Sequence, residues 1–94
     1  MNELNEKQKA FFEKLKSIQE VAVYQSLNEN KKEKDNVENL LYDATYEVIV
    51  SICTLLDGYN DKFKLELIDK ETLLPLRLGI ELHDVCADYL KWEK

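Results

Sequence analysis

The segment from residue 37 to residue 56 constrains the fold most, because it is apolar around more than half the circumference of a helix. Read at about 100° per residue, one stripe of it carries small and aliphatic side chains: Val37, Leu40, Leu41, Ala44, Val48, Ile52 and Leu55. The apolar surface continues around the side through Tyr42, Tyr46, Ile49, Cys53 and Leu56. A surface helix needs an apolar arc of only about 100°. We therefore expect this helix to pack against several elements, or against the chain's own elements and a partner.

Two further helices are expected on either side of this segment. Residues 3–27 carry apolar side chains at helical spacing, and residues 80–92 carry a second such stripe. The members of the two stripes are Leu4, Phe11, Leu15, Ile18 and Ala22 in the first, and Leu82, Val85, Cys86 and Tyr89 in the last. Residues 28–35 contain no apolar side chain and predict a polar loop between antiparallel helices. The central helix then covers about residues 36–57, and Gly58 is placed to end it.

Residues 62–78 leave two interpretations open. Phe63, Leu65 and Leu67 alternate with charged residues, which is the period of a half-buried strand. A turn at 69–72 and a return over 73–78 would complete a short β-hairpin, or an extended arm, because Pro75 cannot donate to a ladder. The competing interpretation is a short helix over about 61–74, which would give an all-α four-helix arrangement.

The predicted fold is therefore a single, mainly α domain over residues 1–94. It has two long antiparallel helices plus a C-terminal helix, with the hairpin or extended arm between the second and the third. With 2 glycines and 1 proline in 94 residues, the chain has few places at which regular structure must break. The predicted core comes from all three helices and consists of Leu15, Leu41, Val48, Ile52, Leu55 and Leu82.

The charge of the chain argues against two classes of partner. Its formal net charge is −6, and nucleic-acid binding depends on clustered Lys and Arg, so we expect no nucleic-acid partner. Anionic lipid surfaces would be repelled as well, and no run of about 20 apolar residues stands out as a membrane span. Two cysteines are too few for a disulfide scaffold. We therefore expect a cytoplasmic protein with reduced, buried and unreactive thiols.

No motif for catalysis, phosphate binding or metal binding stands out. Glu81, Asp84 and Asp88 share one face of the last helix, with His83 nearby, but that pattern is typical of a solvated acidic face. His83 and Cys86 are three residues apart, yet Cys86 lies within the apolar stripe, where a thiol behaves as a small hydrophobe. We assign no catalytic residue, no cofactor and no metal site.

The breadth of the apolar arc on the central helix favours a binding function. Tyr and Trp are frequent at interfaces because they bury much area and keep a polar end. We therefore predict a non-catalytic, small acidic protein-protein interaction or regulatory protein, with a homodimer as one form. The predicted interface consists of Tyr42, Tyr46, Ile49 and Cys53. The alternative is a small enzyme or ligand-binding domain that uses His83 with Asp84 or Cys86.

Overall fold

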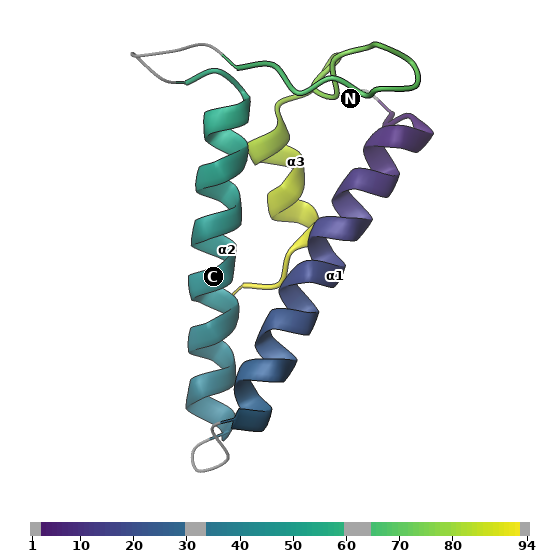
Figure 1. The fold of residues 1–94 in the computed structure, drawn as a ribbon. Coiled ribbons are helices and arrows are strands. Elements are labelled where there is room, and N and C mark those ends of the chain that lie inside the picture. The colour runs from purple at the N-terminus through teal and green to yellow at the C-terminus, as the bar shows by residue number, and fades with distance from the viewer. Residues whose placement is uncertain (1–2, 30–33, 60–64, 93–94) are drawn as a thin grey trace.

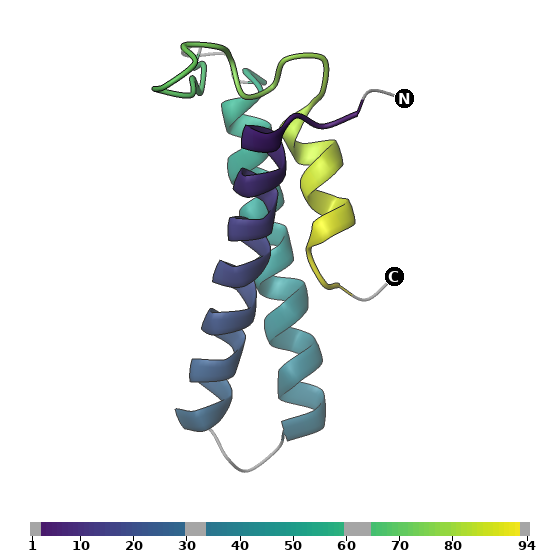
Figure 2. The same cartoon turned by 90° about the vertical axis from the view of Figure 1, so that its right-hand side faces the viewer.

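Three helices build the part of the chain that the computed structural model describes, namely residues 3–29, 34–59 and 65–92. They are α1 (Glu6–Glu29), α2 (Lys34–Leu56) and α3 (Leu82–Tyr89). α1 and α2 form an antiparallel hairpin, and α3 lies between them at the wider end (Figure 1). Seen from the side, α3 covers one face of the hairpin only (Figure 2). The mainly α prediction is confirmed.

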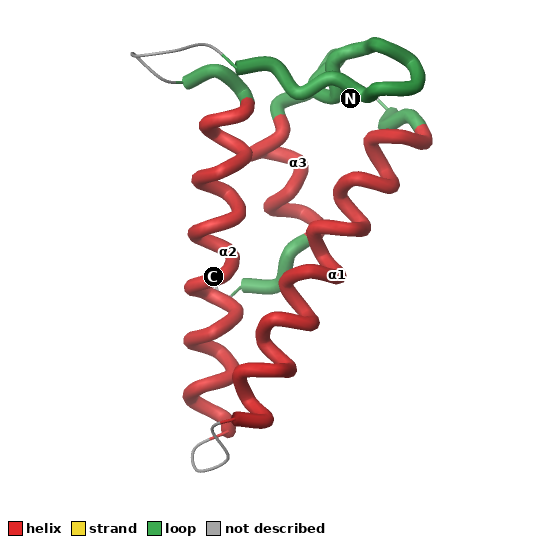
Figure 3. Tube along the Cα trace, viewed as in Figure 1, coloured by secondary structure: helices red, strands yellow, loops and turns green. Residues whose placement is uncertain are grey.

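The β-hairpin predicted over 62–78 is not formed in the described residues 65–78. An isolated antiparallel bridge joins Ile68 to Pro75, supported by the Leu76 N–H donating to the Leu67 carbonyl at 2.8 Å. Proline has no N–H, and Leu73 takes a left-handed φ of 62° in a tight turn, so the pairing does not extend into strands. The alternative short helix is also not seen over 65–74. The segment is an extended arm across one end of the molecule (Figure 3), and its residues 62–64 lie outside the described part.

α1 begins with a reciprocal capping pair. The Gln8 N–H donates to Asn5 Oδ1 at 2.8 Å, and the Asn5 N–H donates to Gln8 Oε1 at 3.0 Å. This capping box satisfies two donors that a helix start otherwise leaves without partners. The Gln8 side chain is buried and its amide also donates to the Leu76 carbonyl at 2.7 Å. One glutamine therefore both starts α1 and holds the arm against it.

α2 ends as its sequence predicts. Gly58 has φ +91°, a left-handed conformation that glycine adopts without a Cβ clash. Its N–H donates to the Leu55 carbonyl at 3.1 Å, and the Tyr59 N–H donates to the Thr54 carbonyl at 3.4 Å. These two bonds form a Schellman motif, which turns the chain out of the helix.

The hydrophobic core lies where α3 and the arm meet the hairpin. Its buried members are Phe12, Cys53, Leu76, Leu82, Cys86 and Leu90. The prediction of Leu82 as a core residue is confirmed, and Leu15, Leu41 and Leu55 are half-buried. The predictions for Val48 and Ile52 are wrong, because these side chains are 58% and 50% exposed. α2 is therefore rotated from the predicted orientation, with its aliphatic stripe largely outside the core.

The buried face of α1 also differs from the face that the sequence predicts. Phe12 and Val23, at the edge of its predicted stripe, are buried, whereas Ile18 in that stripe is half exposed. The centre of the buried face instead contains Gln8 and Gln19. Hydrophobic periodicity assigns a glutamine to water, but a buried glutamine is stable where its amide is fully hydrogen-bonded. The polar bonds of these two residues therefore set an orientation that apolar spacing alone does not reveal.

Candidate functional site

Three of the four predicted interface residues lie against the C-terminal part of the chain. Cys53 is 1% exposed in the core. The ring of Tyr46 stacks on Trp92, with centroids 4.6 Å apart and planes 21° apart, and burial raises the pKa of Tyr46. The ring of Tyr42 lies 4.8 Å below the Lys91 ammonium. These side chains hold α3 and its continuation to the hairpin, and only Ile49 also reaches the opposite side of α2.

Gln19 holds the C-terminal segment in this position. Its Nε2 donates to the Lys91 carbonyl at 2.7 Å, and its Oε1 accepts the Lys91 N–H at 2.8 Å. Nε2 also lies 3.2 Å from the Tyr42 carbonyl and 3.2 Å from Thr45 Oγ1. A single buried amide thus joins α1, α2 and the residues after α3. Sequence analysis missed this role, and the only signal for it is a glutamine at the edge of an apolar stripe.

No helix of the described residues covers the face of the hairpin away from α3 (Figure 2). A groove of about 380 Å³ runs along it between α1 and α2. The groove is lined by Ile18, Gln19, Ala22, Ala44, Thr45, Val48, Ile49 and Ile52. We call the solvent-exposed or half-buried small and aliphatic members Ile18, Ala22, Ala44, Val48 and Ile52 the open face.

The open face offers a partner almost no polar atom. None of the residues that line the groove carries a charge. The amide of Gln19 is occupied inside the molecule, and the Thr45 hydroxyl donates to the Leu41 carbonyl at 2.8 Å. Exposed contiguous apolar surface of this kind commonly marks a binding site.

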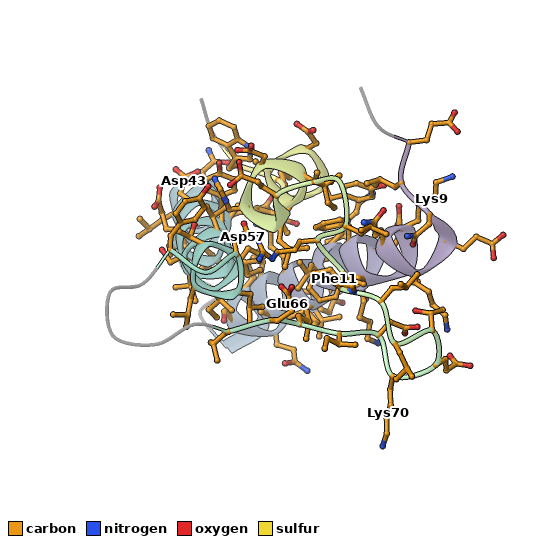
Figure 4. All side chains as sticks on the ribbon, turned by 90° about the horizontal axis from the view of Figure 1, so that it is seen from above. Lys9, Phe11, Asp43, Asp57, Glu66 and Lys70 are labelled. Atoms are coloured by element: carbon orange, nitrogen blue, oxygen red, sulfur yellow. The ribbon has the colours of Figure 1, made fainter. Side chains whose placement is uncertain are left out.

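A second cluster surrounds Asp57, at the end of α2. Its buried carboxylate accepts the Leu82 N–H at 2.8 Å through Oδ1 and the His83 N–H at 2.9 Å through Oδ2. The side chain of Glu81, at the N-cap position of α3, makes no capping bond. Asp57, the residue that follows α2, therefore caps α3 from the interior of the molecule, as Figure 4 shows. The sequence gives no local signal for it, because residues 57 and 82 are far apart in the chain.

His83 completes this cluster. Its Nδ1 lies 2.6 Å from Asp57 Oδ2, and its Nε2 lies 3.3 Å from Asp84 Oδ1. The hydrogen bond with Asp57 raises the pKa of His83, because it favours the protonated ring. Both ring nitrogens of the imidazole thus lie beside carboxylates. In the same cluster, the Tyr59 hydroxyl donates to Glu81 at 2.5 Å.

The donors of this cluster are chemically suited to a divalent cation. One ligand atom each from Asp57, Glu81 and His83 lies within 4.8 Å of the others, and such oxygen and imidazole donors bind transition metals. The Asp57 carboxylate, however, already accepts two backbone N–H groups and the His83 ring. The geometry therefore accounts for a helix cap without an ion. Asp88, which sequence analysis grouped with Glu81 and Asp84, is outside this set.

The two cysteines are free and buried, as predicted. The Cys86 thiol donates to the His83 carbonyl at 3.4 Å. A hydrogen bond with Cys53 and burial raise the pKa of Cys86. A catalytic cysteine needs a lowered pKa, so the pairing of Cys86 with His83 as a nucleophile and base has no support in this geometry.

α2 satisfies the length and composition of a membrane span between Val37 and Leu56, with a mean hydropathy of 1.2. That similarity concerns length and composition alone, and 6% of the span is buried inside the structure. No family model, no curated protein and no solved structure matches the chain.

Proposed function

We propose that this chain is a non-catalytic protein-protein interaction module that binds its partner through the open face. The observation that carries the proposal is the uncharged apolar groove between α1 and α2. Val48 and Ile52 are each at least half exposed on it, although aliphatic side chains gain about 1.5–3 kcal/mol from full burial. A partner that covered the groove would supply that burial.

The character of the groove favours a protein over other ligands. Small-molecule sites usually contain a few polar groups that orient the ligand, whereas the polar groups of this groove are occupied inside the molecule. The net charge of −6 disfavours nucleic acid. Within α2, Asp43 and Glu47 disfavour a lipid environment. A cytoplasmic location belongs to the same proposal and is supported by the free thiols.

The alternative function, an enzyme or ligand-binding domain at His83, is supported by one observation. The imidazole is held by a buried carboxylate, as in many general bases. Its Nε2, however, faces Asp84 rather than a nucleophile. We therefore place this alternative second.

Site-specific photo-crosslinking in the native cell tests the proposal. A photoreactive amino acid in place of Ala44, on the open face, is expected to form a covalent adduct with another protein chain. The matched control replaces Glu13, which is exposed on α1 and lies outside the groove lining, and should give no adduct. Equal crosslinking at the two positions, or none at Ala44, would contradict the proposal.

A further inference from the structure

We propose that the occupant of the open face is a second copy of this chain. Two hairpins would pack face to face about a two-fold axis that runs along the length of the hairpin, and together form a splayed four-helix assembly with one α3 on each outer side. This inference rests on the proposed function, because it names the partner of the same surface.

The size of the open side of the hairpin is sufficient for a dimer. α1 has 24 residues and α2 has 23, so each helix is about 35 Å long at a rise of about 1.5 Å per residue. α1 and α2 diverge towards the end that holds α3 (Figure 1), so the width of about 20 Å for two helices with axes about 9 Å apart is the lower limit for the face they present. If one turn is left for the arm at one end, this lower limit gives a buried area of roughly 600–700 Å² for each copy, or roughly 1,200–1,400 Å² in total. Stable interfaces begin at about this area.

The charge distribution favours a copy of the same chain on this side. Two chains of net charge −6 repel each other, and the cost is smallest where the surfaces in contact carry no acidic group. The residues that line the groove meet that condition. An uncharged surface therefore lowers the electrostatic cost of self-association for this acidic chain.

Charges of opposite sign flank the open face on its two helices. Lys14 lies one turn before Ile18 on α1, and Glu47 lies one turn after Ala44 on α2; both are exposed. Gln19 of α1 contacts Tyr42 and Thr45 of α2. Since the helices are antiparallel, that contact puts Lys14 and Glu47 within about one turn of the same level.

The proposed axis makes these flanking charges complementary. A two-fold axis along the length of the hairpin places α1 of one copy against α2 of the other and keeps the levels aligned. Lys14 of each copy then lies beside Glu47 of the other copy, and symmetry makes this pair twice. The same surface has no such complementarity with an arbitrary apolar partner.

Sedimentation equilibrium of the purified full chain tests the inference. We expect a mass near 22 kDa, twice the 11.1 kDa of one chain, with a dissociation constant in the micromolar range or tighter. Val48→Lys and Ala44→Lys should each be monomeric with unchanged helical circular dichroism, because both side chains are exposed. The matched control is Tyr24→Lys, which changes a 67% exposed aromatic residue of α1 outside the open face and should leave the dimer intact.

Charge reversal separates the proposed pairing from general repulsion. Lys14→Glu and Glu47→Lys should each weaken dimerisation about tenfold, because two exposed pairs become repulsive. The double variant should restore the affinity to within about threefold. Glu47→Lys makes the net charge less negative by two units, so general repulsion alone would strengthen the dimer. A stronger dimer in that variant would overturn the proposed axis.

The outcomes distinguish this inference from the proposed function. A wild-type chain that stays monomeric up to millimolar concentration, about 1 mM, would overturn the second copy as occupant. In that case, an Ala44 photo-adduct of a mass other than twice the chain mass still supports the proposed function, and the absence of any adduct overturns both proposals.

Discussion

Two buried glutamines of α1 hold segments without regular structure against the helices. Gln8 binds the arm through the Leu76 carbonyl, and Gln19 binds the C-terminal segment through both polar groups of Lys91. Among the described residues, every buried side-chain nitrogen and oxygen has a hydrogen-bond partner. The desolvation cost of the two amides is therefore offset, and each amide fixes a segment that has no regular structure.

Removal of the Gln19 amide should destabilise the fold. In Gln19→Ala, the Lys91 N–H and carbonyl lose their partners, which is expected to lower the free energy of unfolding by about 1–3 kcal/mol. The matched control is Gln25→Ala, an exposed glutamine of the same helix, with an expected change of about 0.5 kcal/mol or less. Urea unfolding of both variants measures the difference. Equal midpoints would show that the Gln19 bonds contribute nothing net.

The contact between His83 and Asp57 should make stability depend on pH. The hydrogen bond with Asp57 raises the pKa of His83 above its ordinary value of 6.5, so the folded chain binds this proton more tightly than the unfolded chain does. The stabilisation is fully present below the unfolded pKa, and it is lost as pH rises through the folded pKa.

Unfolding free energies between about pH 6 and about pH 9 would measure this effect. We expect the stability of the wild type to fall across that range. In His83→Gln the decline should be smaller, because the titrating group is absent while the α3 cap on Asp57 can persist through the backbone. An identical slope in the two proteins would assign the pH dependence to other groups.

At the scale of single elements, α2 carries two apolar faces and uses only one of them for the core. One face contains Cys53 and Tyr46, which meet α3 and Trp92. The other contains Val48 and Ile52 and faces solvent. The more aliphatic stripe of a helix is usually its buried side, and here it is the open one. The position of α3 and of the stacked Trp92 ring decides between them.

This orientation of α2 and α3 predicts that two similar side-chain truncations lower the free energy of unfolding by different amounts. Leu82→Ala removes a fully buried side chain and should cost about 2–5 kcal/mol. Ile52→Ala, at a half-exposed position, should cost less than about 1 kcal/mol in dilute protein, where self-association does not contribute. Thermal or urea unfolding at low concentration makes the comparison. Similar losses for the two variants would mean that Ile52 faces the core.

At the scale of the whole molecule, one short helix and an arm cover one face and one end of a long hairpin (Figures 1 and 2). Small domains bury a low fraction of their surface, and this one has 94 residues. The chain therefore lacks an element of its own to cover the second face in its described part. That shortage is the physical reason why we propose an external partner.

The thiols should report on the opening of the whole molecule. Cys53 and Cys86 are buried together between α2 and α3, so a labelling reagent reaches them only when these helices separate. We expect both thiols of the native protein to react slowly and at matching rates, and rapidly in denaturant. Fast labelling of Cys86 alone in the folded protein would instead indicate local opening at α3 and revive a reactive cysteine.

The sequence by itself determined the elements of this protein. Helical periodicity predicts the three helices, the polar stretch before residue 36 predicts the antiparallel hairpin, and Gly58 predicts the end of α2, because each of these signals is local. The burial of Leu82, Cys53 and Cys86 in the structure agrees with the predicted core and thiols. The alternating pattern after residue 62 predicted pairing that Pro75 and the turn at Leu73 prevent from extending.

Only the tertiary structure decided which faces of these helices are inside. The open face and the Asp57 cap depend on contacts between residues far apart in the chain, such as Asp57 with Leu82 and Gln19 with Lys91. Periodicity measures how apolar each side of a helix is, but α2 is apolar on two sides. Which side is buried depends on where α3 docks, and that position is set by buried hydrogen bonds that no local pattern encodes.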